Sequence, residues 1–288
     1  LAQGLMEGGP KQARAALERF WTAIGSEVAF EWLTIRSDDS IELSPTARLM
    51  MRWMQNLSPK QFNPLDRNPL RDILAEQIDF DALRRHAGPQ LYISATHANS
   101  GRLRLFTRDE LSLEAVLASA CLPTLHHTVM IDGQPYWDGG FSANPALYPL
   151  VWNAGSAPDT LLVLLAPLEH EHTPTTAAQI RERVLDISFN STFLRELRTL
   201  AEVQARLARA WLPLGSMERR AVRARWHVVN GHDTLAALPG ESRMIAHLPF
   251  LEKLRDAGRE QAKAWLRKHR RDVGRHSSIE LGKLVGRQ

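Results

Sequence analysis

The sequence predicts an α/β protein, built as one large domain or two small ones. Its 288 residues and 44% hydrophobic content are enough to bury a core. Short runs typical of strands, such as Gln90–Thr96 and Leu103–Thr107, alternate with amphipathic stretches typical of helices, such as Pro10–Ile24. The longest apolar runs, such as Leu161–Leu165, stay far short of the roughly 20 residues that cross a bilayer, so we expect no membrane-spanning segment.

The first part of the chain is predicted to form an amphipathic helix, then a cap or lid region, and then two short helices. Pro10–Ile24 has a proline near its first turn and apolar residues at helical spacing, and we expect it to pack against a sheet. From Asp38 to Pro69, turn residues surround a short helical stretch over Pro45–Gln55, a pattern that indicates a cap or lid. Two short helices are predicted next, over Leu70–Ala75 and Phe80–His86.

Strands are predicted after these helices. Gln90–Thr96 follows a Gly-Pro turn and is rich in residues that favour strands, so it is the candidate central strand. Leu103–Thr107 alternates apolar and polar residues as the next strand. Leu113–Cys121 is a short helix of small residues that ends before a proline.

A hairpin is predicted around Asp132-Gly133. The flanking runs Val129–Ile131 and Pro135–Trp137 are apolar, and Asp-Gly between such runs is a strong hairpin signal. Hairpin geometry with positive φ at the glycine explains Asp132 completely. This aspartate therefore needs no catalytic role.

Asp138 differs from Asp132, because it directly follows the second run and precedes Gly139 and Gly140. The chain turns away immediately after this carboxylate, which is typical of a site residue at a strand end. The alternative is an Asx turn, in which the aspartate bonds its own backbone two residues on.

The second half of the chain predicts a scaffold of strands and long helices. Strands are expected over Leu161–Leu165 and Trp226–Asn230, and a charged amphipathic helix over Phe250–Arg270. Ile187–Leu212 has apolar residues at helical intervals up to a proline. Core packing explains that apolar face; an acyl-chain groove or a membrane-contact face is the alternative.

Net charge and cysteine content limit the classes of partner and the cellular compartment that we expect for this chain. The net charge of +4 is modest, and its two basic runs, Arg219–Arg225 and Arg267–Arg271, lack interleaved aromatic residues, which argues against nucleic-acid binding. The cations suit a solvated helix C-terminus or contact with anionic lipid headgroups. Cys121 is the only cysteine, so no internal disulfide can form, which favours a reducing compartment.

The segment from Leu117 to Pro145 resembles the patatin-like lipolytic acyl hydrolases. A small-residue helix ending in proline precedes Ile-Asp-Gly, then Tyr-Trp-Asp-Gly-Gly, then Asn-Pro. Asp186–Leu197 and His276–Ile279 are similar to a bacterial branch with a C-terminal extension. The resemblance implies a three-layer α/β sandwich with a central, mostly parallel sheet flanked by helices. It implies a catalytic part over residues 1–165 and a mostly helical extension over 166–288 packed on it.

The resemblance also implies a mechanism, a Ser-Asp dyad in which Asp138 of the Asp138-Gly139-Gly140 motif is the base. The 288 residues contain neither a Gly-x-Ser-x-Gly nucleophile motif nor a glycine-rich oxyanion loop. The serine is expected about a dozen residues before Leu1, in a strand-turn-helix context. The implied substrate is a phospholipid or other ester, with no cofactor or metal, and with cytoplasmic location or peripheral contact with an anionic membrane. This chain alone is expected to be inert.

Three alternatives stay open at this point. The chain could be a catalytically inactive patatin-like module that acts in binding or assembly. His126 and His127 could form a local relay with Ser119 or Ser142 and an aspartate, although neither serine follows a glycine elbow. A metal site would draw on four neighbouring side chains, but a third ligand at clear spacing is missing and a solvated loop explains the pattern better. Those side chains are Glu169, His170, Glu171 and His172.

Overall fold

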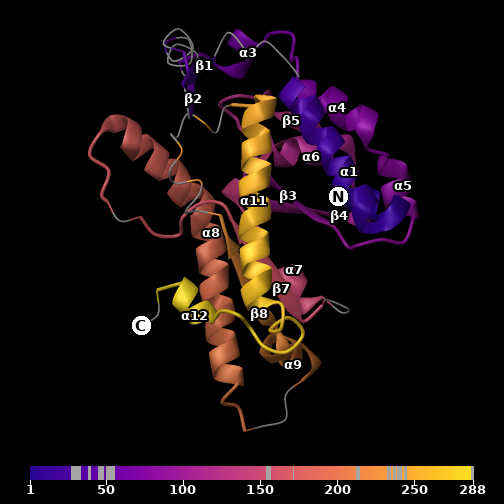
Figure 1. Cartoon of the computed structure of the whole chain (residues 1–288), viewed down its shortest axis with the longest axis vertical. Coiled ribbons are helices and arrows are strands. Elements are labelled where there is room, and N and C mark those ends of the chain that lie inside the picture. The colour runs from indigo at the N-terminus through magenta and orange to yellow at the C-terminus, as the bar shows by residue number, and fades with distance from the viewer. Residues whose placement is uncertain are drawn as a thin grey trace. The chain divides into compact units, whose positions relative to one another are not determined.

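The computed structural model groups the chain into two compact units, each described here by itself (Figure 1). Unit 1 comprises Leu1–Ser142 and Pro239–Arg255, and unit 2 comprises Ala143–Leu238 and Asp256–Gln288. The helix predicted over 45–55 falls almost entirely outside the described residues, and the domain boundary predicted at residue 165 stays a prediction. The structure describes residues 1–26, 34–37, 40–44, 49, 56–153, 157–170, 172–211, 215–231, 235, 238, 242 and 245–286.

Unit 1 combines short helices with a four-stranded sheet and a two-stranded one. The order in the larger sheet is β4-β3-β6-β5, so the strand predicted as central does lie inside it. The helices of this unit are α1 (Ala2–Ser26), α3 (Pro59–Phe62), α4 (Pro69–Gln77), α5 (Phe80–Arg85) and α6 (Leu113–Ser119), with 3₁₀ turns η1 (Arg108–Glu110) and η2 (Gly139–Phe141). Its strands are β1 (Thr34–Ser37), β2 (Ser40–Leu43), β3 (Tyr92–His97), β4 (Leu103–Thr107), β5 (Val129–Ile131) and β6 (Gln134–Asp138).

Helix α1 is interrupted as its sequence dictates. Gly8 and Gly9 leave helical geometry, with a positive φ of 71° at Gly9, and Pro10 begins the second segment. The helix predicted over 10–24 is therefore confirmed. Its packing prediction is wrong in part, because α1 packs chiefly against α4 rather than against a strand. Leu17 and Trp21 remain substantially exposed on it.

All strand pairs in the four-stranded sheet are antiparallel, so the prediction of a central, mostly parallel sheet is not met there. Short connections account for two of the three pairs, β3–β4 and β5–β6. A parallel pair needs a crossover of about a dozen residues or more, whereas β5 and β6 are joined by Asp132 and Gly133 alone. Both turn residues have positive φ, 50° and 73°, which confirms the predicted hairpin.

One face of the four-stranded sheet is covered by α6. Ala115 and Ala118 of this helix are fully buried against Ala95 of β3 and Phe106 of β4. Small residues on the helix let its backbone approach the sheet closely. The small-residue helix seen in the sequence is thus a packing device, and it fixes the strands that carry Asp138.

Unit 2 contains the parallel pairing. Strand β7 pairs with β8 in parallel, with Asp159 opposite Arg225, and the long crossover between them includes α8. Its elements are α7 (Tyr148–Trp152), β7 (Asp159–Leu164), α8 (Ala177–Leu207), α9 (Ser216–Arg223), β8 (Arg225–Asn230) and α12 (Leu281–Leu284). Helix α11 (Leu248–His269) has its first residues in unit 1 and the others in unit 2.

The core of unit 2 lies between the β7–β8 pair and the second half of α8. Phe193, Leu197 and Leu200 of α8 are buried with Leu162 of β7 and Trp226 of β8. The first half of α8 begins ten residues before the predicted helix and changes direction in Figure 1. The Ser188 hydroxyl donates to the Val184 carbonyl at 2.7 Å, a bond that often bends helices. No described helix is long and apolar enough to span a bilayer.

Candidate active site

Asp138 is held by strand pairing on one side and by a backbone bond on the other. It is the last residue of β6 and lies opposite Ala95 in the interior strand β3. Its N–H donates to the carbonyl of Cys121 at 2.8 Å, which ties the strand end to the segment after α6. The chain then turns at once into η2. Asp138 therefore ends a strand, as the sequence predicted, and its backbone position is fixed.

The Asp138 carboxylate uses one oxygen to hold the turn. Oδ1 accepts a hydrogen bond from the Gly140 N–H at 2.7 Å. This is the Asx turn that the sequence left as an alternative, so that alternative is present. Oδ2 has no hydrogen-bond partner among the described residues. The turn therefore leaves Oδ2 able to accept a hydrogen bond or a proton from another group.

The surroundings of Asp138 favour its protonated form. Burial raises the pKa of this carboxyl above the ordinary aspartate value, and the hydrogen bond from Gly140 opposes the increase only in part. No lysine or arginine forms an ion pair with it within the described ranges. A carboxylate with a raised pKa is a stronger base near neutral pH than an ordinary aspartate.

Gly139 permits the close approach of η2 to β3. A Cβ atom at this position would overlap the carbonyl oxygen and the hydroxyl of Ser94. Because that carbonyl belongs to the backbone of an interior strand, it cannot move aside cheaply. Glycine is therefore required here for packing.

Two hydroxyl groups support the turn: that of Ser142, which the sequence offered only as a relay candidate, and that of Thr96, which the sequence analysis did not select. Thr96 Oγ1 donates to the Asp138 carbonyl at 2.7 Å and lies 2.8 Å from Ser142 Oγ. Thr96 is only 5% exposed. The signal in the sequence was the pair Ser94 and Thr96, polar residues two apart and hence on one face of an interior strand.

The part of the chain that contains Asp138 matches a known protein family. A family model described as patatin-like phospholipase matches residues 6–151, just over half of the 288 residues. The chain belongs to the patatin-like phospholipase family. It is thereby a member of a family of lipid acyl hydrolases that act on lipid esters. The matched segment contains Asp138-Gly139-Gly140 and ends in α7, so the resemblance predicted for residues 186–197 and 276–279 stays a prediction. No curated protein matches the chain.

The structure does not assemble the local histidine relay in this patatin-like chain. His127 Nε2 lies 2.8 Å from the Asn63 carbonyl and Nδ1 lies 3.8 Å from Asp66. Ser142 is hydrogen-bonded to Thr96 instead of a histidine. Burial lowers the pKa of His126, which keeps that ring neutral.

Cys121 lies close to the candidate base but is not a nucleophile. Its side chain is 1% exposed, and Sγ lies 3.1 Å from the His127 carbonyl. Burial, followed by the negative charge of Asp138, raises the pKa of the thiol to about 11. The thiol is therefore protonated and inert at neutral pH.

The predicted metal candidates are not brought together. His170 Nε2 lies 3.7 Å from Asp186, and the His172 carbonyl accepts from Arg183 at 3.4 Å. Glu171 lies outside the described residues. Within the part of the chain that the structure describes, no three His, Cys, Asp or Glu side chains gather as a metal site would require.

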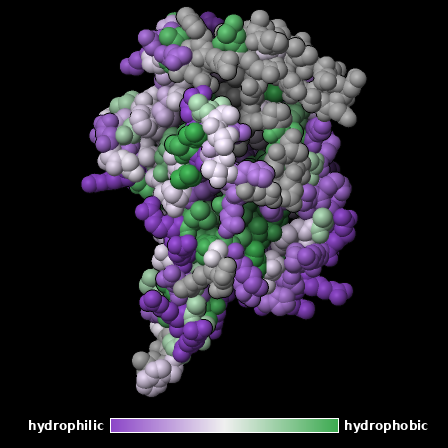
Figure 2. Space-filling model, turned by 90° about the vertical axis from the view of Figure 1, so that its left-hand side faces the viewer, coloured by the Kyte–Doolittle hydropathy of each residue, from purple (hydrophilic) through white to green (hydrophobic). Residues whose placement is uncertain are grey.

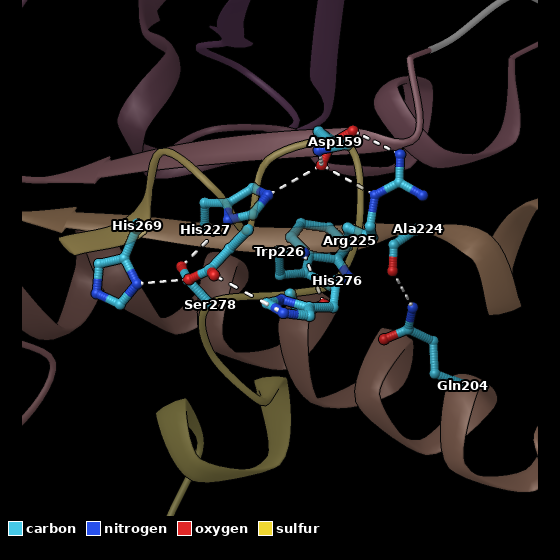
Figure 3. A network of polar contacts seen from close by, with 12 residues as sticks. Asp159, Gln204, Ala224, Arg225, Trp226, His227, His269, His276 and Ser278 are labelled. Atoms are coloured by element: carbon cyan, nitrogen blue, oxygen red, sulfur yellow. Dashed lines mark hydrogen bonds and ion pairs between the residues drawn. The ribbon is translucent and has the colours of Figure 1, made fainter. Parts of the chain in front are cut away.

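Unit 2 of the patatin-like phospholipase chain contains a second carboxylate site that the sequence analysis missed (Figure 3). Asp159 accepts two bonds from Arg225, with Nε at 2.9 Å from Oδ1 and Nη2 at 2.7 Å from Oδ2. His227 Nε2 and the Gly274 N–H each lie 3.0 Å from Oδ1. These donors, with Arg225 the largest cause, hold the pKa of Asp159 far below its usual range.

The Asp159 network anchors the segment that follows α11. His227 is 1% exposed, and its Nδ1 lies 3.1 Å from the Ser278 hydroxyl. The Ser278 N–H in turn donates to the Trp226 carbonyl at 3.0 Å. The signal in the sequence was an aspartate just before one predicted strand and an arginine just before the other. That the two lie opposite each other follows from the parallel pairing of β7 with β8. The fully bonded carboxylate indicates a structural role for Asp159.

Proposed function

We propose that this chain carries the basic half of a Ser-Asp dyad in a lipid acyl hydrolase, with Asp138 as the base. The nucleophilic serine would come from residues outside these 288. The observation that supports the proposal is the state of Asp138: its pKa is raised by burial and its Oδ2 has no partner among the described residues. Asp138 also lies inside the segment that matches the family.

The proposed chemistry begins with proton transfer. The serine Oγ–H would lie about 2.6–3.2 Å from Asp138 Oδ2 and give its proton to the carboxylate as Oγ attacks the ester carbonyl carbon. The C–O bond to the leaving alcohol then breaks, and protonated Asp138 returns the proton to that alcohol oxygen. An acyl-serine is left. In the second half, Asp138 takes a proton from water as the water oxygen attacks the acyl carbon. The bond between that carbon and the serine Oγ then breaks, Asp138 returns the proton to Oγ, and the carboxylic acid leaves.

A complete site needs more than the base. Backbone N–H groups must stabilise the oxyanion, and the loss of one such donor typically lowers the rate by about 10²–10³. The 288 residues contain no glycine-rich loop of that kind and no Gly-x-Ser-x-Gly. Two surface hollows of about 400 and 410 Å³ are lined by residues of unit 2, and Asp138 lines neither. We therefore expect the isolated chain to be inert.

A patatin-like module that only binds or assembles is the second candidate. The two candidates differ in one measurable property. In the first, a serine elsewhere in the complete protein depends on Asp138 for its reactivity; in the second, no such serine exists.

We also propose peripheral contact with anionic membranes, through which lipid esters would be reached. The exposed Arg219 and Arg223 of α9, with Arg267 and Lys268 near the end of α11, supply the cations. Each basic residue near an anionic surface gains about 1 kcal/mol. Co-sedimentation with vesicles that contain or lack phosphatidylglycerol tests this, and equal recovery on both would contradict it.

The dyad is tested in the complete protein with a matched pair of variants. Asp138→Asn removes the base, whereas Asp132→Asn changes an aspartate six residues away whose positive φ asparagine tolerates. A fluorophosphonate probe reports covalent labelling of a reactive serine, and p-nitrophenyl butyrate and a phospholipid report turnover.

We expect labelling and turnover in the wild-type protein and in Asp132→Asn, with both strongly reduced in Asp138→Asn. Turnover that survives Asp138→Asn would overturn the assignment of the base. Absence of labelling in the wild-type complete protein would favour the inactive module.

A further inference from the structure

The first half of α8 exposes a row of large apolar side chains. Ile180, Val184 and Ile187 are 46%, 55% and 59% exposed, respectively. Their spacing of four and three residues places them on one face of the helix. Figure 2 shows hydrophobic residues gathered into patches on the face that it presents, with hydrophilic residues around them. We call these three residues the apolar row.

The apolar row leads into a surface hollow of about 400 Å³ in unit 2. Continuing the same spacing beyond Ile187 reaches Ser191, then Leu194 and Arg195, then Arg198, and all four of these residues line the hollow. Its other lining residues come from two further segments, Leu168 and Glu169 after β7, and Leu284 and Val285 at α12. Helix α8 changes direction near Ser188, so the row lies on its first half and the hollow on its second, and the two adjoin between Ile187 and Ser191.

The hollow has apolar walls and a cationic end. Leu168, Leu194 and Leu284 pack against the core of unit 2, so they are fixed in place. Arg198 Nη2 donates only a long bond of 3.5 Å to the Val285 carbonyl. Within the described ranges neither Arg195 nor Arg198 forms an ion pair, so most of their N–H donors are available. Glu169 is the single anionic residue among the lining side chains.

We propose that this surface binds a long-chain carboxylate, a fatty-acid anion, as a second site separate from Asp138. Arg195 and Arg198 would hold the carboxylate, because the planar guanidinium matches its two oxygens. The alkyl chain would lie in the hollow and along Ile187 and Val184. The eleven residues from Val184 to Arg195 correspond to about 16.5 Å measured along the helix, and to less in a straight line because α8 bends near Ser188.

The observations favour a single chain with an anionic head. Besides the apolar row, this half of α8 exposes Leu185, which is 54% exposed and lies about 100° around the helix from Val184. The apolar surface is therefore narrow, and it ends at two arginines, which matches one alkyl chain and one acidic group. A bilayer would instead require a broad apolar face with cations along its edges. The inference stands apart from the proposed catalysis, because it concerns binding only and uses none of the residues around Asp138.

The headgroup is tested by isothermal titration at concentrations below micelle formation. Dodecanoate, dodecanol and dodecyltrimethylammonium share a twelve-carbon chain and differ in charge, and none of them contains an ester bond that could be hydrolysed during the titration. We expect dodecanoate to bind about tenfold more tightly than dodecanol, and the cation to bind more weakly than either, because two exposed arginines act together.

Three variants locate the headgroup. Arg195→Ala with Arg198→Ala should abolish the preference for dodecanoate over dodecanol, while Arg206→Ala, on an exposed arginine of the same helix outside the hollow, should leave it intact. Glu169→Gln removes the one lining anion and should tighten dodecanoate about twofold to fivefold. A gain of this kind cannot come from misfolding.

The position of the alkyl chain is tested by varying the length of the fatty acid. From decanoate to tetradecanoate, each added methylene should tighten binding about twofold to fourfold, the range between half and full burial. Val184→Ser with Ile187→Ser should flatten this dependence and keep the headgroup preference.

Several results would overturn the proposal. These are equal binding of dodecanoate and dodecanol, binding unaffected by the paired arginine changes, or binding to anionic vesicles with none to monomeric dodecanoate. The last result would assign the surface to a membrane. None of these results bears on Asp138, and a failure of the serine-labelling experiment would leave this binding site untouched.

Discussion

Asp138 is the last residue of strand β6 in unit 1, and Asp159 is the first residue of strand β7 in unit 2. Both are partly buried, yet their pKa values are shifted in opposite directions. The pKa of Asp138 is raised by burial, whereas that of Asp159 is lowered chiefly by its bonds to Arg225. Within the described part of the chain, the Asp138 carboxylate accepts one hydrogen bond, from the Gly140 N–H. Asp159 accepts bonds from the guanidinium, from His227 and from the Gly274 N–H.

The comparison shows that the number of hydrogen-bond donors around a carboxylate, and not its burial alone, decides the direction of its pKa shift and therefore its role. A carboxylate surrounded by donors stays ionised and holds segments together. A carboxylate with one donor and a free oxygen can accept a proton and give it back. The two units of this chain thus use the same residue type for opposite purposes.

The largest expected effect is on catalysis. In the complete protein, Asp138→Asn should lower kcat/KM for an ester substrate by about 10²–10⁴-fold, because general base catalysis typically contributes that much. Asp159→Asn should leave kcat/KM within about twofold, since its carboxylate is fully occupied. Steady-state kinetics on both variants measure this, and similar losses in the two would break the distinction.

The second prediction disturbs Asp138 without changing its carboxyl group. Gly139→Ala would drive a Cβ into the backbone of Ser94 and should cost about 3 kcal/mol in the free energy of unfolding. Gly258→Ala is the control, because nothing lies within 4 Å of its Cβ position in α11 and alanine should add about 1 kcal/mol. Urea unfolding compares them, and equal effects would contradict the close approach.

The third prediction concerns Asp159 as a structural anchor. Asp159→Ala would leave the buried His227 N–H and the Gly274 N–H without an acceptor and should destabilise the protein by about 2 kcal/mol. Hydrogen exchange should show the segment around Ser278 opening first. Unchanged protection there would mean that Asp159 does not anchor it.

The smallest expected effect is on the pH dependence of folding stability, to which the two carboxylates should contribute with opposite sign. The lowered pKa of Asp159 gives stability that is fully present above the ordinary aspartate pKa of 3.8 and is lost as pH falls through the lowered value. The raised pKa of Asp138 gives stability that is present below 3.8 and is lost as pH rises through the raised value.

Unfolding at about pH 3 and about pH 7 tests these signs. Asp138→Asn should be modestly more stable than wild type at the higher pH only, and Asp159→Ala should lose less at the lower pH than at the higher one. The reverse pattern in either variant would show that the shift has been assigned to the wrong carboxylate.

Local patterns predicted most of the elements near Asp138. The alternation in β4, the Asp132-Gly133 turn and the strand end at Asp138 depend on neighbours in sequence, so they could be recognised. The antiparallel sheet could not be inferred from the resemblance, because strand direction depends on which strands pair. The burial that shifts the pKa of Asp138 is likewise a property of packing.

The Asp159 site was hidden for a related reason. Its partners Arg225 and Gly274 lie 66 and 115 residues further along the chain, and no periodicity connects them. Helix α8 was predicted to begin at residue 187 because its apolar core residues follow that point, whereas its first turns are stabilised by the Thr176 capping box and expose their apolar side chains.

The single thiol of the chain can be used to measure local opening of the structure around Asp138. Cys121 is sealed from solvent, and its own carbonyl holds the Asp138 N–H. A thiol reagent can therefore react only when this part of unit 1 opens, and the labelling rate then gives the free energy of that opening. Because the chain has no second cysteine, a label followed over time would measure how often the candidate base loses its backbone support.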